Sequence, residues 1–268
     1  VEIGGKPFHS LAFLAVVGLS LMAGGYWFVG LCYSRGYDYF LWLYNAWLVG
    51  ETAWRGSWPN WSAYSAAGHP FFKTAGVADA FIFSLFTQSA GFELGTQIYT
   101  CLLYVTAGAG MYALVCHLGG ARTGAVVAAA AYVFSWFMTF TVYYQTYLNN
   151  FLTYAIMPWA ALFFIKAIAE QSRRYLFAAA GMLFLSVTSN AQVSIKLILF
   201  VVPLAFVETV ICRSLSWRRW FAYSAVLGAM ALSWAVFLIV PALELRKEVF
   251  LLGGLRSVQF IKPWEVLV

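Results

Sequence analysis

The chain has 268 residues, of which 63% are apolar and only 10% are charged, whereas soluble domains carry roughly 25% charged residues. Its 16 Lys and Arg against 10 acidic residues give a net charge of +6, but the basic residues stand mostly in short breaks between apolar runs. That placement is typical of the orientation signal of a membrane protein and not of a nucleic-acid-binding surface. The composition excludes a soluble domain and predicts an integral membrane protein.

Apolar runs recur along the whole chain. A helix needs roughly 20 mainly apolar residues to cross a bilayer, and the first run is too long for the apolar part of a signal peptide. The sequence therefore predicts an all-α integral membrane fold of about seven transmembrane helices, forming a single transmembrane domain over residues 1–268. The runs lie at 9–32, 94–117, 123–143, 150–169, 174–190, 194–212 and 220–241.

The connections between these runs alternate in charge. Residues 117–122, 170–174 and 212–219 are basic, whereas 143–150 and 188–192 carry no charge. Basic loops stay on the cytoplasmic side, so a long loop at 33–93 and a tail at 242–268 are expected on the outer face. The basic residues of the tail run against this rule, which their distance from the main orienting signals makes tolerable.

The outer loop 33–93 is too aromatic to be a free loop, although it holds four of the ten acidic residues. Its first part, Asp38 to Trp54, is almost wholly apolar and aromatic and predicts a helix lying in the membrane interface. Turn residues at 55–60 follow. A second apolar run at 76–90 is short for a spanning helix and predicts an interfacial or re-entrant one.

Asp38 is the first catalytic candidate, because it lies just outside the first spanning run at the membrane surface. A carboxylate there suits a general base that accepts the proton of an incoming hydroxyl. An Asp before a helical run is also typical of an N-cap. Glu51 cannot share a substrate with it on a continuous helix, because thirteen residues correspond to about 20 Å of rise and about 140° of rotation.

Asp79 is the second candidate carboxylate. It follows the Pro- and Gly-containing turns of the outer loop, so the chain can fold it back toward Asp38. A helix cap is again the alternative interpretation.

Trp58, Trp61 and His69 stand among rigid turns on the expected outer face. Indole rings stack on the C–H face of a sugar while polar groups bind its hydroxyls. We therefore assign these residues to substrate binding, with headgroup anchoring by the Trp residues as the alternative.

Lys196 lies a few residues inside an apolar run whose outer end carries Gln192. A buried lysine there is costly unless it meets an anion, for which a lipid phosphate is suited, or reaches the interface by snorkelling. Gln192 and neighbouring amides would form a polar vestibule on the outer side only.

Metal and disulfide chemistry have little support in the sequence. The cysteines, Cys32, Cys101, Cys116 and Cys212, are widely spaced and form no metal or disulfide pattern. The cofactor is therefore left unassigned, and a divalent metal stays open. Because the chain begins with Val1 and stops at Val268 without a polar tail, we expect a piece of a longer protein, such as an N-terminal module.

Several short motifs together resemble the GT-C superfamily of membrane glycosyltransferases, and most of all its poorly characterised bacterial branch. These are Gly36-Tyr37-Asp38 after the first spanning run, Gly56-Ser57-Trp58-Pro59-Asn60-Trp61, Gly68-His69-Pro70, Pro158-Trp159 and Ser189-Asn190-Ala191-Gln192. Members usually continue into further helices or an outer domain, whereas this chain stops just after the seventh run.

The resemblance implies a multi-pass protein of the bacterial cytoplasmic membrane that transfers a sugar from a polyprenyl-phosphate donor with inversion. Asp38 takes the catalytic position of the family, and Asp79 matches its second acidic motif only loosely. Lys196 or Arg246 would hold the leaving phosphate. The expected partners are membrane lipids, the lipid-linked donor and other proteins of a larger complex, and not nucleic acid.

Two other functions compete with this one. The chain could be a non-catalytic membrane subunit that retains only a GT-C-like fold within a larger complex. A transporter ranks last, because few charges lie at mid-membrane depth and no matching pair of broken helices is present.

Overall fold

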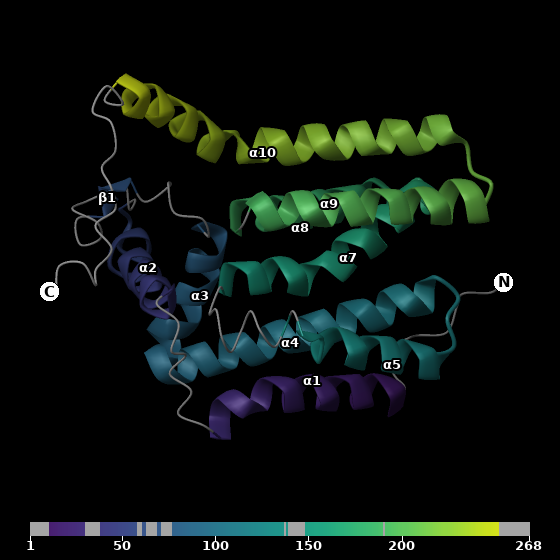
Figure 1. Ribbon diagram of the computed structural model, residues 1–268, viewed down its shortest axis with the longest axis horizontal. Coiled ribbons are helices and arrows are strands. Elements are labelled where there is room, and N and C mark those ends of the chain that lie inside the picture. Colours follow the sequence, from purple (N-terminus) through teal and green to yellow (C-terminus); the bar gives the residue numbers. More distant parts are fainter. Residues whose placement is uncertain are drawn as a thin grey trace, which may run out of the picture.

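A computed structural model describes residues 11–29, 38–57, 61–62, 69–70, 77–136, 138, 148–189 and 191–251. The fold is all-helical apart from one pair of two-residue strands. Seven described helices lie roughly side by side along the long axis of the molecule (Figure 1). They are α1 (Leu11–Val29), α4 (Phe92–His117), α5 (Arg122–Val133), α7 (Leu148–Glu170), α8 (Arg173–Ser189), α9 (Ala191–Phe206) and α10 (Trp217–Leu251).

The elements of the predicted outer loop gather at one end of this bundle (Figure 1). They are α2 (Asp38–Thr52) with a 3-10 turn (Ala53–Arg55), β1 (Trp61–Ser62), β2 (His69–Pro70) and α3 (Val77–Ala90). The two segments expected to be helical in this loop are therefore confirmed as helices, while their place in the membrane interface stays a prediction. A short antiparallel strand pair lies between them in sequence.

Each apolar run of the sequence contains one of the long helices, with two changes of boundary. The helix expected at 123–143 ends at Val133, where the backbone of Phe134 turns and its N–H bonds the carbonyl of Ala130. At the other end of the chain, α10 continues to Leu251 and so enters the predicted tail 242–268. A π-helical turn (Val207–Cys212) closes the run that begins with α9.

Two of the described helices are long and apolar enough to cross a membrane. They are Phe92–His117, with a mean hydropathy of 1.6, and Asn150–Glu170, with a mean hydropathy of 1.7. Leu11–Gly25, Arg122–Val133 and Ile198–Cys212 are apolar but shorter in the described part of the chain. By length and composition, α4 and α7 are thus the two candidate membrane-spanning helices among the described residues.

Helix α4 is the centre of the bundle, and small residues allow its neighbours to approach closely. A Cβ at Gly108 would collide with the hydroxyl of Ser20 on α1, and one at Gly110 would lie 2.6 Å from the indole nitrogen of Trp159 on α7. That indole donates to the carbonyl of Thr106, 2.9 Å away. Packing through small residues is the usual way in which membrane helices associate.

A proline in α7 is accommodated by a hydrogen bond from another helix. Pro158 has no N–H, so the carbonyl of Tyr154 lacks its partner four residues later in the helix. The hydroxyl of Tyr132 on α5 donates to that carbonyl at 2.7 Å. The polar group that the proline frees is therefore satisfied inside the bundle, as apolar surroundings demand.

The three basic connections meet at the end of the bundle opposite α2 and α3 (Figure 1). The guanidinium of Arg213 contacts Glu208 at 2.8 Å and the imidazole of His117 at 3.5 Å. With its amide oxygen turned toward the guanidinium, Gln171 accepts from both terminal nitrogens of Arg219, at 3.0 and 2.9 Å. These contacts join the end of α4 to the connection that follows α9, and the end of α7 to the start of α10.

Candidate functional site

The candidate site is the end of the bundle where α2 and α3 pack. Helix α2 begins at Asp38, and the indole of Trp54 in the following 3-10 turn donates to the hydroxyl of Ser84 on α3 at 2.7 Å. Helix α3 is joined to α4 through Gly91, whose φ of 80° and ψ of 169° suit glycine alone. This turn folds α3 back onto α4, where a Cβ at Gly95 would lie 2.6 Å from the carbonyl oxygen of Phe86.

Two of the sugar-binding candidates are brought together on the strand pair. Trp61 of β1 pairs with Pro70 of β2, and Ser62 pairs with His69. The backbones of Trp61 and His69 are therefore adjacent, one position out of register with each other. Trp58 lies outside the described residues, so its place in the site stays a prediction.

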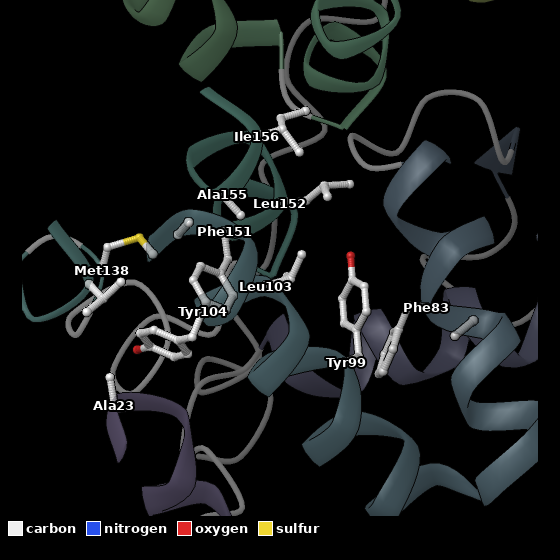
Figure 2. Packing of buried hydrophobic residues seen from close by; sticks show 13 residues of the cluster. Ala23, Phe83, Tyr99, Leu103, Tyr104, Met138, Phe151, Leu152, Ala155 and Ile156 are labelled. Carbon is white, nitrogen blue, oxygen red and sulfur yellow. The ribbon is translucent and has the colours of Figure 1, made fainter. Parts of the chain in front are cut away.

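Asp79 lies in the first turn of α3 and is fully buried. One of its carboxylate oxygens accepts a hydrogen bond from the hydroxyl of Tyr99 on α4. Tyr99 is also fully buried, and its ring stacks on that of Phe83 with the centroids 5.2 Å apart. Figure 2 shows these two rings on one side of the main hydrophobic cluster, with Tyr104 and Phe151 on the other. The carboxylate therefore ties α3 to α4 from within the core.

Burial controls the chemistry of this carboxyl group. Loss of hydration raises the pKa of Asp79 from 3.8 to about 7, although the hydrogen bond from Tyr99 acts in the opposite direction. Within the described part of the chain, its Oδ2 has no hydrogen-bond partner. Because burial penalises the charged form, the protonated carboxyl suits these surroundings better than the carboxylate. A carboxyl whose pKa lies near neutrality is suited to proton transfer, but the exposed fraction of this one is 0%.

Other buried polar groups surround this end of α4. Thr96, Tyr99 and Thr100 are all buried, and their spacing places them on one stripe of the helix. The hydroxyl of Thr100 and the amide oxygen of Asn45 on α2 have no partner among the described residues. Among those residues, no group of three or more His, Cys, Asp or Glu could hold a metal ion. The sequence-based prediction did not include this stripe, although polar residues three and four positions apart within an apolar run indicate one.

The remaining candidates are placed only by their backbones. Asp38 begins α2, Gln192 and Lys196 lie in the first two turns of α9, and Arg246 lies in the last part of α10. The start of α9 and the end of α10 lie at the same end of the bundle as α2 (Figure 1). Their side chains are outside the described part of the structure, so the expected approach of Asp38 to Asp79 stays a prediction.

Comparison with protein-family models, with curated proteins and with solved structures finds no match to this chain. The assignment of a function therefore rests on the residues and their arrangement.

Proposed function

We propose that this chain is a membrane glycosyltransferase of the GT-C type, which transfers a sugar from a polyprenyl-phosphate donor to an acceptor at the outer face of the membrane. In this proposal α1, α4, α5, α7, α8, α9 and α10 span the bilayer. The end with the basic connections is cytoplasmic, and the end with α2, the strand pair and α3 is external.

The observation that carries the proposal is that the basic connections and the candidate carboxylates lie at opposite ends of the bundle. Basic connections joined by the contacts of Arg213 and Arg219 occupy one end. The candidate carboxylates begin α2 and α3 at the other. A lipid-linked donor moves in the plane of the bilayer and presents its sugar at one surface, so a site confined to one end fits this donor better than it fits a channel.

Exposed apolar side chains support the membrane placement. Leu14, Phe200, Phe221 and Leu232 are 62–72% exposed and lie on α1, α9 and α10. A soluble protein rarely exposes so many large apolar groups. Lipid chains would cover them in a bilayer.

The proposed reaction is a displacement at the anomeric carbon. Asp38 accepts the proton of the acceptor hydroxyl, whose oxygen then attacks that carbon as its bond to the phosphate oxygen breaks. The electron pair leaves with the polyprenyl phosphate, whose charge Lys196 or Arg246 stabilises. Asp79 is a positioning residue in this scheme, because its buried bond to Tyr99 fixes α3 beneath the site.

A transfer assay tests the role of Asp38. The purified chain in proteoliposomes is supplied with a panel of polyprenyl phosphates that carry tritiated hexoses or pentoses. Asp38→Asn is expected to lower the transfer rate by roughly 100-fold or more, as loss of a general base does. Glu51→Gln is the matched control, because Glu51 lies on the same helix in an exposed pair with Arg55, 2.7 Å away. Equal rates for Asp38→Asn and wild type would refute the assignment.

Thiol labelling tests the proposed topology independently of activity. Ser57 lies at the α2 end of the bundle and Ser216 at the end with the basic connections, and both residues are exposed. Each is replaced by a single cysteine in a separate variant. In intact cells, a membrane-impermeant maleimide is expected to label Ser57→Cys alone, and to reach Ser216→Cys only after permeabilisation. The same labelling at both positions in intact cells would contradict the orientation. The background for both variants replaces each native cysteine with alanine.

A non-catalytic subunit remains the second candidate, and the burial of Asp79 favours it. A carboxyl that bonds Tyr99 in the core stabilises a fold whether or not chemistry occurs there. A wild-type chain that folds and inserts with the proposed topology, yet transfers no sugar from the whole donor panel, would favour this reading.

A further inference from the structure

A cavity of about 140 Å³ lies inside the bundle, between α7, α8, α9 and α10. Twelve of its fifteen lining residues have no polar side-chain group. Helix α7 passes it at the kink-prone Pro158, which separates the lining residues Met157 and Ala160. The cavity is therefore an apolar space of the size that holds a small hydrocarbon, since an engineered cavity of about 150 Å³ binds benzene.

The few polar groups of the wall already have partners inside the protein. Ser186 shares a hydrogen bond of 2.6 Å with the hydroxyl of Ser194. The hydroxyl of Ser224 donates to the carbonyl of Trp220 at 2.9 Å. A water molecule needs two or more polar partners to occupy a cavity, so this space favours an apolar occupant over water.

The wall is less buried on the side of α9 and α10 than on the side of α7. All three lining residues of α9 and two of the three on α10 are half-buried, whereas three of the five on α7 are buried, among them Ile156 and Phe164 at 5% and 0% exposure. A Cβ at Gly228 would find no atom within 4 Å. The cavity thus opens between α9 and α10, whose outer faces carry the exposed Phe200 and Leu232.

We infer that this cavity binds a segment of one acyl chain of a membrane phospholipid, which enters between α9 and α10. The inference rests on the membrane placement proposed above, because that placement puts the exposed apolar faces of α9 and α10 in contact with lipid chains. The opening then faces the hydrocarbon of the bilayer. The acyl chain fills a space that the side chains leave empty and restores the dispersion contacts that its walls lack.

Photolabelling tests this site. The chain is placed in nanodiscs of phosphatidylcholine and phosphatidylglycerol in which one acyl chain carries a diazirine near its terminal methyl group. After irradiation, adducts are expected on Met157 and Met182, which line the cavity, and on Phe200, which is 72% exposed on the outer face of α9. Phe200 reports contact with lipid, and the two methionines report entry into the cavity.

Variants that fill the cavity distinguish binding of an acyl chain inside it from contact of lipid with the outer surface of the helices. Gly228→Leu is expected to reduce the adducts on Met157 and Met182 severalfold while those on Phe200 stay unchanged. Gly124→Leu is the matched control, because Gly124 also has open space around its Cβ but lies on α5, away from the cavity. Ser224→Leu, from the same wall as Gly228, is a second filling variant should Gly228→Leu fail to fold.

Three outcomes would overturn the inference. Labelling of Phe200 without labelling of the methionines would show that lipid reaches α9 but not the cavity. Unchanged methionine labelling in both filling variants would show that the lipid reaches the methionines from outside the cavity. Loss of methionine labelling on adding a small amount of polyprenyl phosphate would assign the cavity to that lipid and not to a phospholipid. Absence of labelling at Phe200 as well would refute the membrane placement itself, which distinguishes that failure from failure of the cavity site.

Discussion

Replacing Asp79 with Asn is expected to change the pH dependence of stability. The pKa of Asp79 is raised from 3.8 in the unfolded chain to about 7 in the folded one, so the folded state binds this proton more tightly. A group of this kind stabilises the fold fully below about pH 4, and its contribution falls as the pH rises toward 7. Over that interval the loss amounts to roughly 4 kcal/mol, at about 1.4 kcal/mol for each pH unit.

Asn has nearly the same shape as a protonated Asp but does not ionise. Its amide oxygen can accept the hydrogen bond from Tyr99, so the packing of α3 on α4 is kept. The Asp79→Asn variant is therefore expected to exceed wild type by only about 1 kcal/mol at pH 4.5. At pH 8 it is expected to exceed wild type by roughly 10 °C in melting temperature, if 1 kcal/mol corresponds to about 2–4 °C.

The measurement is thermal unfolding of the purified chain in detergent, followed by tryptophan fluorescence across pH 4.5 to 8. Glu51→Gln is the matched control, because it removes a carboxylate from α2 at a site that is about one-third exposed. That control is expected to follow the wild-type curve. If the melting temperature of Asp79→Asn changed with pH in the same way as that of wild type between pH 4.5 and 8, the buried, proton-binding role of this residue would be refuted.

Three further substitutions test the contacts that hold the bundle together. Tyr99→Phe removes the donor to Asp79 and is expected to lower stability by about 1.5–3 kcal/mol at pH 8, as loss of a hydrogen bond to a charged group does, and by less at pH 4.5. Gly110→Ala drives a methyl group into the indole of Trp159 and is expected to cost about 1–3 kcal/mol through overpacking. Glu208→Gln weakens the partly buried pair with Arg213 and is expected to lower the melting temperature measurably at low salt, with a smaller loss at high salt.

Two control variants provide reference values for the stability losses expected of these three substitutions. Gly124→Ala is expected to be neutral or slightly stabilising, because its Cβ meets no atom and alanine favours a helix. Arg55→Gln breaks an exposed ion pair whose members are 68% and 34% exposed, so its effect is expected to stay below about 1 kcal/mol. A loss for Gly110→Ala no larger than for Gly124→Ala would contradict the close contact between α4 and α7.

The helices were predictable because apolar runs and turn residues are local signals. Asp38 begins α2 and residues 77–90 form α3, close to the boundaries that the sequence indicates. The end of α5 at Val133 was not predictable in the same way, because residues 134–143 continue the apolar run without a glycine or proline. Composition thus locates the helices better than it locates their ends.

The partner of Asp79 could not be predicted, because it depends on a contact between helices. Asp79 and Tyr99 are 20 residues apart, and they meet only because the chain reverses at Gly91. A helix cap was the alternative to catalysis in the sequence, whereas the structure places the carboxyl in a hydrogen bond across two helices. Burial of that kind arises from packing and leaves no local mark in the sequence.

Helix α4 links the candidate site to the rest of the bundle. Its first third holds α3 through Tyr99, and its second half holds α1 and α7 through Gly108 and Gly110. Helix α2, which begins with Asp38, is held on α3 by the hydrogen bond of Trp54 and by apolar packing of Leu48 and Val49. Loss of the Trp54 bond alone should therefore loosen α2 on α3 only locally, whereas a change at Gly110 should destabilise the bundle as a whole.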